Sequence, residues 1–280
     1  MTRLAGRILV TLAVATAFAA ASVAPGPAAR GAQDGTPGAG PATLPEGVAV
    51  APLLTERLTD LPPAPVFVAL VRLTYLPGTA VVSPAVTGTT LLYVESESIV
   101  VEVGEVEATG SPGPAGAGAA SPAAGGGTPV EAGRAIVVPA DTPFVSRNDG
   151  SESAVTLQVR ISPSANPPPS GGPLAFDRLG SGVAAALPAV PVQVEMSRVT
   201  LDAGASTTPM VVPGPVLVRV EIGTLNLVTP GSEATLAVGG TAFIQAGTES
   251  AARNAAAEPL VLLVVTISPA TAGDGATPAA

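Results

Sequence analysis

Short runs in which apolar and polar residues alternate recur along the chain. They are rich in Val and are bounded by Gly, Pro or Ser, as in VFVALVRLTY, AVTLQVRI, VQVEMSRVTL and VLVRVEI. Because side chains alternate between the two faces of a strand, the pattern predicts β-strands, and no helical periodicity competes with it. Many short strands separated by turn residues are typical of an all-β sandwich or barrel.

Segments rich in Gly, Pro and Ala separate these runs. Their composition cannot form a core, so we expect flexible linkers there. The chain is then predicted to comprise a signal peptide, a disordered linker, a first barrel with a Gly/Pro/Ala insert at 108–129, a second linker, a second barrel and a disordered tail. The boundaries are 1–24, 25–46, 47–165, 166–187, 188–270 and 271–280, in that order.

The two predicted barrels are copies of one another. Arg72 and Gly78 recur 126 positions later as Arg198 and Gly204, and the Val, Thr and Glu residues around them follow the same offset. Towards the end of each half the offset is 106, as between Asn148 and Asn254. The insert in the first half explains the change, since a longer surface loop costs little free energy. The sequence therefore predicts a tandem duplication.

The glycine spacing in each half resembles the cupin family, and specifically the two-domain bicupins, over about residues 47–165 and 180–270. Cupins are small jelly-roll β-barrels with the motifs G-x5-H-x-H-x3-E-x6-G and G-x5-P-x-G-x2-H-x3-N, whose His and Glu residues bind one metal. The second half keeps the spacing from Gly204 to Gly223. Its ligand positions hold Met210, Val212, Val216 and Ser250.

The first half departs further from the cupin pattern. Its ligand positions hold Pro84, Val86, Thr90 and Phe144, while Glu97 and Asp141 stand where the motifs have Gly. With every ligand position substituted, the resemblance implies two cupin-type barrels with degenerate metal sites and no cofactor.

Strand alternation predicts that both barrel interiors are apolar. If Val216 faces inward, then Val218 and Val220 do so too, whereas Leu217, Arg219 and Glu221 face outward. In the first half the inward set is Thr90, Leu92 and Val94, with Tyr93 and Glu95 outward. The eight former ligand positions then either line a small apolar pocket or simply fill the core.

Composition excludes several chemistries. The chain of 280 residues has no His and no Cys, its basic residues are all Arg, and its net charge is -9. Without these types there is no Ser-His-Asp, Cys-His or Ser-Lys mechanism, and the usual transition-metal ligands are missing. A net acidic chain without a basic cluster is also a poor partner for nucleic acid.

The N-terminus indicates export. Arg3 and Arg7 precede an apolar run at 8–24 that ends in small residues, which is the pattern of a secretory signal peptide. An uncleaved membrane anchor is the alternative, since the run is close to the shortest spanning length. We therefore expect a secreted or envelope-associated protein.

Together these observations predict an exported, non-catalytic, metal-free bicupin that binds a small molecule or carbohydrate, or acts as a protein-interaction module. One alternative is a structural envelope scaffold without a ligand, with a homodimer formed through the barrel sheets. Another is a cupin enzyme that uses a non-standard site. A cavity above about 300 Å³ inside a barrel would favour binding, and a filled interior would favour the scaffold.

Overall fold

The computed structural model describes residues 44–83, 85, 87–104, 126–165 and 174–270. These residues form eighteen β-strands and no helix that could span a membrane. The all-β prediction is confirmed. The expected signal peptide and tail, most of the first linker, and Pro84 and Val86 lie outside the described residues.

Barrel 1 consists of two antiparallel sheets. The five-stranded sheet has the order β10-β2-β9-β4-β7, and the four-stranded sheet has the order β3-β8-β5-β6. The strands are β2 (Val66–Tyr75), β3 (Ala80–Ser83), β4 (Thr89–Ser96), β5 (Ser98–Val103), β6 (Thr128–Glu131), β7 (Ala135–Val138), β8 (Phe144–Arg147), β9 (Ala154–Ser162) and β10 (Leu174–Ala184).

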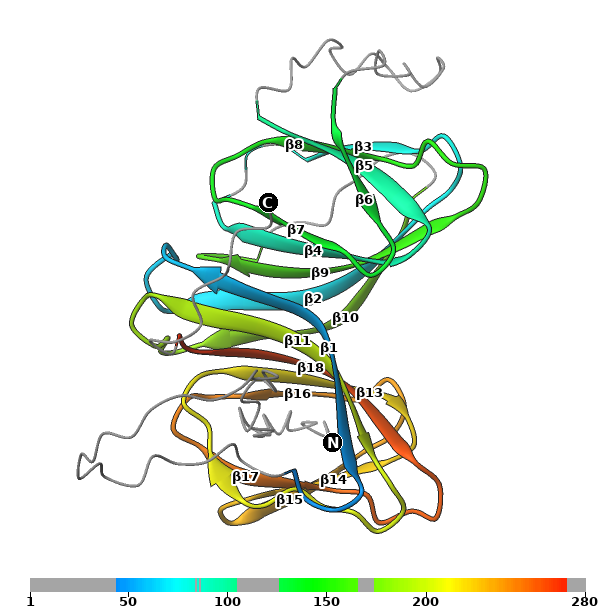
Figure 1. The fold of residues 1–280 in the computed structure, drawn as a ribbon. Coiled ribbons are helices and arrows are strands. Elements are labelled where there is room, and N and C mark those ends of the chain that lie inside the picture. The colour runs from blue at the N-terminus through cyan, green and yellow to red at the C-terminus, as the bar shows by residue number, and fades with distance from the viewer. Residues whose placement is uncertain (1–43, 84, 86, 105–125, 166–173, 271–280) are drawn as a thin grey trace, which may run out of the picture.

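Barrel 2 repeats this arrangement, as the duplication predicts. Its sheets have the orders β1-β11-β18-β13-β16 and β12-β17-β14-β15. The strands are β1 (Val48–Leu58), β11 (Val192–Leu201), β12 (Met210–Val211), β13 (Val216–Ile222), β14 (Leu225–Thr229), β15 (Ser232–Leu236), β16 (Thr241–Ile244), β17 (Glu249–Arg253) and β18 (Leu260–Pro269). The two five-stranded sheets face each other at the centre of the molecule, and the four-stranded sheets lie outside them (Figure 1).

The predicted domain boundaries need correction, because the barrels exchange strands. β1, which was expected in barrel 1 at 47–165, pairs with β11 of barrel 2. The second linker was predicted at 166–187, yet residues 174–184 form β10 and pair with β2 of barrel 1. The insert also ends earlier than predicted, since β6 begins at Thr128.

The alternating pattern did not predict β10 as a strand, because β10 contains small residues where it packs closely against barrel 2. A Cβ added at Gly182 would lie 2.1 Å from the ring of Phe243, so only Gly fits there. Side chains of barrel 2 also bind the β10 backbone. Gln245 donates to the Val183 carbonyl at 2.8 Å, and Arg219 donates to the Leu179 carbonyl at 2.8 Å.

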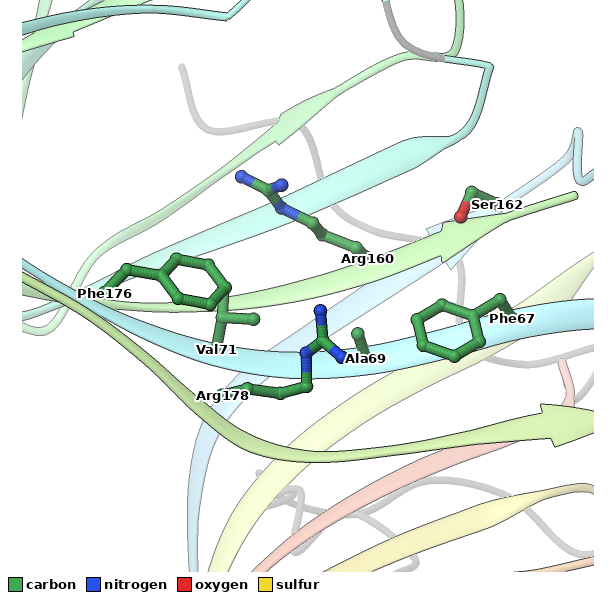
Figure 2. Close-up of a pocket in the computed structure, with 7 residues that line it drawn as sticks. All are labelled: Phe67, Ala69, Val71, Arg160, Ser162, Phe176 and Arg178. Atoms are coloured by element: carbon green, nitrogen blue, oxygen red, sulfur yellow. The ribbon is translucent and has the colours of Figure 1, made fainter. Parts of the chain in front are cut away.

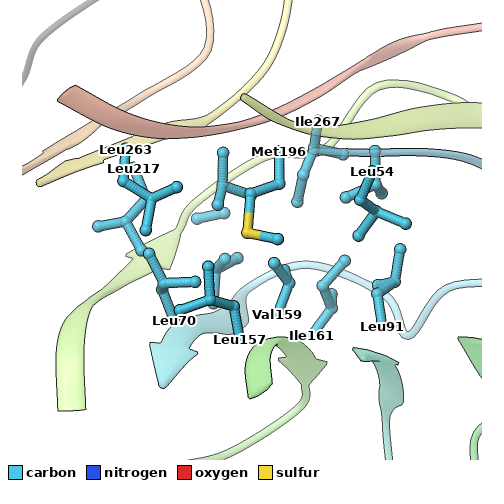
Figure 3. Close-up of a cluster of buried hydrophobic side chains, with 14 of the residues drawn as sticks. Leu54, Leu70, Leu91, Leu157, Val159, Ile161, Met196, Leu217, Leu263 and Ile267 are labelled. Atoms are coloured by element: carbon cyan, nitrogen blue, oxygen red, sulfur yellow. The ribbon is translucent and has the colours of Figure 1, made fainter. Parts of the chain in front are cut away.

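The largest apolar cluster lies between the two five-stranded sheets, not inside either barrel. Figure 3 shows Leu54, Met196, Leu217, Leu263 and Ile267 on one side and Leu70, Leu91, Leu157, Val159 and Ile161 on the other. All of these side chains are buried, and each contributes roughly 1.5–3 kcal/mol to stability. The two barrels therefore form one folded unit.

The predicted facing of β4 and β13 is confirmed. Val216, Val218 and Val220 pack in the apolar cluster inside barrel 2, while Leu217 packs in the cluster between the sheets. In barrel 1, Leu92 and Val94 pack inside, and Tyr93 faces the other barrel.

Four charged side chains cross the edge of the contact between the barrels. Arg72 and Arg198 are equivalent in the duplication, as are Glu95 and Glu221. Arg198 donates to Glu221 at 2.8 Å and to Glu95, and Arg72 lies 3.3 Å from Glu95 and 3.6 Å from Glu221. The hydrogen bonds to Glu221, helped by Glu95, raise the pKa of Arg198. Glu95 and Glu221 are thus interface residues.

Arg198→Gln should lower the free energy of unfolding by about 1–2 kcal/mol, because it leaves two carboxylates facing each other with only Arg72 between them. The side chains of the network are 17–34% exposed, so the loss should shrink in 1 M salt. Urea unfolding at low and high salt measures this. Arg253→Gln, at an exposed position, is the matched control; an equal loss in both variants would contradict the prediction.

Two residues of barrel 1 keep the left-handed backbone of the glycines that they replace. Glu97 has φ 62° where its equivalent, Gly223, has φ 84°. Asp141 has φ 57° where Gly247 has φ 78°. These two turns therefore have the same backbone conformation in both barrels, at the cost of strain in barrel 1 at residues with a Cβ.

Glu97→Gly should therefore stabilise the protein by up to about 1 kcal/mol, measured as a shift in the urea unfolding midpoint. Gly78→Ala is the opposite test, since φ is 71° and a Cβ would meet no atom within 4 Å. It should lose about 1 kcal/mol from backbone strain alone. If both changes act in the same direction, backbone conformation does not control these turns.

Candidate functional site

A polar stripe on β9 faces the interior of barrel 1. Leu157, Val159 and Ile161 pack between the sheets, so the alternating residues Thr156, Gln158, Arg160 and Ser162 face the barrel, as Ala154 does. The expectation of a wholly apolar interior is therefore wrong for barrel 1. That expectation rested on β4 and β13 alone, whereas the polar side chains come from the neighbouring strand.

A small pocket opens at the end of this stripe. Arg160 and Ser162 of β9 line it together with three residues of β2 and two of β10, namely Phe67, Ala69, Val71, Phe176 and Arg178. Figure 2 shows both guanidinium groups rising from the same side of the sheet, with the Phe67 ring at one end and the Phe176 ring at the other. The cavity volume is about 10 Å³, the space of roughly one water molecule.

The pocket is positively charged and has no internal counter-ion. In the part of the chain that the structure describes, neither Arg160 nor Arg178 forms an ion pair with a carboxylate. Arg160 donates instead to the neutral Gln158 amide oxygen at 2.9 Å. Burial lowers the pKa of Arg160, and Tyr75 opposes this in part. A half-buried cation of this kind favours the approach of an anion.

Hydrogen-bonding groups continue from Arg160 into the barrel. The Tyr75 hydroxyl lies 3.0 Å from that of Ser146 and is fully buried. Thr156 and Gln158 lie close enough to Tyr75 to affect its pKa, yet neither the Thr156 hydroxyl nor the Gln158 amide nitrogen has a hydrogen-bond partner among the described residues. The Tyr75 phenol is a group that these two side chains could bond, since both lower its pKa as hydrogen-bond partners.

Two of the predicted site residues of barrel 1 are described. Thr90 is 2% exposed and is the register partner of Arg160 across the β4–β9 pair, so it lies beside the polar stripe. Phe144 is 1% exposed and packs in the barrel 1 core. The placement of Pro84 and Val86 lies outside the described residues.

In barrel 2 the structure brings the four predicted residues to one end. Met210 and Ser250 are register partners across β12 and β17. Val212 and Val216 are buried and line one hollow, which has a volume near 0 Å³. The Ser250 hydroxyl is buried and, within the described residues, has no partner. Whether any of these positions contacts a ligand stays a prediction.

One larger hollow borders the insert of barrel 1. It has a volume of about 550 Å³ and is lined by residues of β5, β6 and β7 with Gly126 and Gly127. The residues before Gly126, at 105–125, lie outside the described residues.

The asparagines kept in both halves hold turns. Asn148 donates to the Tyr75 and Glu152 carbonyls and accepts from Gly150. Asn254 makes the equivalent bonds around Leu201 and Glu258. The arginine before Asn148 binds Asp149 at 2.8 Å, so it is not an open anion site.

Sequence reasoning missed the residues that carry this site, Arg160, Arg178, Phe67 and Phe176. AVTLQVRI does show a polar residue at every second position, but alternation alone does not say which face is inside. Phe176 and Arg178 fell in a segment predicted as linker, so their contribution could not be seen without the β10–β2 pairing.

Among the comparisons with known proteins, only solved structures match the chain. No family model and no curated protein matches the chain. A cupin 2 conserved barrel domain protein from Leptotrichia buccalis is 12% identical over 79% of this chain and 89% of its own, with a TM-score of 0.38. The formate complex of oxalate decarboxylase from Lactobacillus farciminis is 13% identical over 77% and 81%, with a TM-score of 0.48.

The structural neighbours include cupin-domain proteins. A further one, YhaK from Escherichia coli, is 15% identical over 78% of this chain and 94% of its own, with a TM-score of 0.44. At these identities the likeness concerns the fold and leaves the activity open. Within the described residues, no group of three or more His, Cys, Asp or Glu side chains could hold a metal ion.

Because the phenol of Tyr75 is buried, the free energy of unfolding should change with pH in the alkaline range. Burial raises the pKa of Tyr75 above its usual value, an effect that the Ser146 hydrogen bond reduces only in part. As the pH rises above about 10, the unfolded chain loses a proton that the folded chain keeps, so the free energy of unfolding falls. Tyr75→Phe should remove this fall between about pH 9 and 11, measured by urea unfolding. Tyr93→Phe should keep it; if Tyr93→Phe also removes the fall, Tyr75 is not its source.

Proposed function

We propose that this protein is an exported, non-catalytic binding module, and that barrel 1 binds the head group of a small organic anion. One observation carries the proposal. Arg160 and Arg178 place two guanidinium groups at one pocket, and neither has a carboxylate partner among the described residues. An unpaired cation in a half-buried site is costly, and a bound anion would offset that cost.

A carboxylate suits these residues best. A guanidinium presents a planar fork of N–H donors that matches the two oxygens of a carboxylate, and such charge-assisted bonds are stronger than neutral ones. Phe67 and Phe176 offer apolar faces on either side, against which a hydrocarbon or sugar ring could pack. A carboxylate on a ring is therefore the ligand class that we favour, and an acidic carbohydrate belongs to it.

The size of the pocket limits what enters. With a volume of about 10 Å³, it has room for a head-group oxygen and not for a whole ligand. The ring would stay at the mouth, where the Arg178 side chain is exposed and can adjust. This arrangement suits a binding module, since it leaves the body of the ligand outside the barrel.

A non-catalytic role is supported by the residues that are missing. The whole sequence lacks His and Cys, and the cupin ligand positions hold apolar or hydroxyl side chains. Export is supported by the apolar run after Arg7. The acidic net charge of -9 favours a small molecule over nucleic acid as the partner.

A structural scaffold is the second candidate, and packing favours it. Among the described residues, the hollows lined by Arg160 and by Val216 measure about 10 Å³ and near 0 Å³, far below the roughly 300 Å³ of ordinary ligand pockets. A scaffold would use the sheet faces for contact with a second copy and would bind no small molecule.

Calorimetric titration with sodium benzoate and sodium acetate separates these candidates. We expect saturable binding, tighter for benzoate because its ring can contact Phe67 and Phe176. Arg160→Gln should weaken benzoate binding at least tenfold, since it removes the half-buried member of the cation pair. Binding should also weaken as salt is raised.

Arg253→Gln is the matched control, because it makes the same change of charge at an exposed position on β17. It should bind benzoate as the unmodified protein does. Equal affinity in Arg160→Gln and Arg253→Gln would refute the anion site. No binding of either probe, together with dimers in sedimentation, would favour the scaffold.

A further inference from the structure

We propose that barrel 2 holds a second site, of opposite sign, that binds the ammonium group of a small primary amine at Glu195. The site is independent of the anion site proposed for barrel 1. It lies at the equivalent place in the other copy of the fold, on the interior face of β11 and its neighbours.

Register places the groups of this site side by side. On β11, Val194 and Met196 pack between the sheets and Val199 packs inside barrel 2, so Glu195 and Ser197 face the barrel interior. Glu195 is the register partner of Thr266 on β18 and of Thr55 on β1. Cross-strand partners lie on the same face, so two hydroxyls flank the carboxylate.

The carboxylate is buried without a counter-ion. Glu195 is 7% exposed, and among the described residues it accepts one hydrogen bond, from the Ser197 hydroxyl at 2.6 Å, and forms no ion pair. Thr266 is 8% exposed, and its hydroxyl has no hydrogen-bond partner among the described residues. A buried carboxylate beside an unsatisfied hydroxyl is costly unless a donor completes both.

The duplication relates the surroundings of Glu195 to the arginine pocket of barrel 1. Glu195 stands where barrel 1 has Ala69, which lines the arginine pocket. Thr266 stands in place of Arg160, and Pro52, on β1, stands in place of Arg178. The two copies thus carry charges of opposite sign in the same region of the fold, at positions that are not equivalent.

The groups present select an ammonium over a metal ion. One carboxylate neutralises one positive charge, whereas a divalent ion would keep a buried excess charge. Hard metal ions also take six or more oxygen ligands, and this site offers one carboxylate and a few hydroxyls. An ammonium group has three N–H donors, which match Glu195, Ser197 and Thr266. The hollow that Thr266 lines has a volume near 0 Å³, so an ammonium nitrogen would enter only when the surrounding side chains move.

The test is a calorimetric titration of the full chain with methylammonium chloride at constant ionic strength. We expect saturable binding that Glu195→Gln weakens at least tenfold, with Thr266→Val weakening it severalfold. Tetramethylammonium, which has no N–H donor, should not bind. Benzoate binding at barrel 1 should be unchanged in both variants, which separates this site from the other.

Glu233→Gln, an exposed carboxylate on β15, is the matched control and should bind methylammonium normally. Arg57 is the one cation of β1 on the same face as Thr55, and its register partner is Gln193. Unchanged or tighter binding of methylammonium in Arg57→Gln supports the proposal. Thermal unfolding checks that Glu195→Gln and Thr266→Val are folded. No saturable binding, equal binding in Glu195→Gln, or tighter binding of calcium chloride at Glu195 would overturn the proposal.

Discussion

The apolar layer between the two five-stranded sheets is the contact on which the rest of the structure depends. Each of these sheets is covered on both faces, by a four-stranded sheet on one side and by the other barrel on the other. Strands such as β9 and β18 must then supply one apolar face to the shared layer. Apart from the charges at its rim, this layer is apolar, so the other polar groups of β9 and β11 lie on the face turned into the barrel.

Strand exchange follows from the same layer. Leu54 and Leu58 of β1 belong to the apolar cluster between the sheets, as Leu179 of β10 does, so each exchanged strand seals the layer at an edge. The charges of Arg72, Glu95 and their duplicates then close the rim of the contact. The barrels cannot separate without exposing this layer, which explains why a two-copy chain folds as one unit.

The strands and the duplication could be predicted from the sequence, because the first leave a local alternating pattern and the second leaves a constant offset. β2 and β11 appear in it as alternating runs, and the facing of β4 and β13 follows from alternation. The exchange of β1 and β10 could not be predicted, because pairing between distant strands leaves no local pattern and Gly182 breaks the alternation. The polar stripe was visible as Thr156, Gln158 and Arg160, but only the packing of Leu157 shows that its opposite face is the shared layer.

The two copies differ in an informative way. Asn148 and Asn254 keep the same turn bonds, and Glu97 keeps the left-handed backbone of the glycine that it replaces, so the framework resists change. The barrel ends do not: Arg160 stands in one copy and Glu195 faces inward in the other. Chance substitution of a core would favour apolar residues, since an unpaired buried charge lowers stability. The two charges stand at positions that are not equivalent, since Thr266 is the counterpart of Arg160 and Ala69 that of Glu195. Packing alone does not explain why each barrel buries a charge of its own sign, which favours separate ligands for the two barrels.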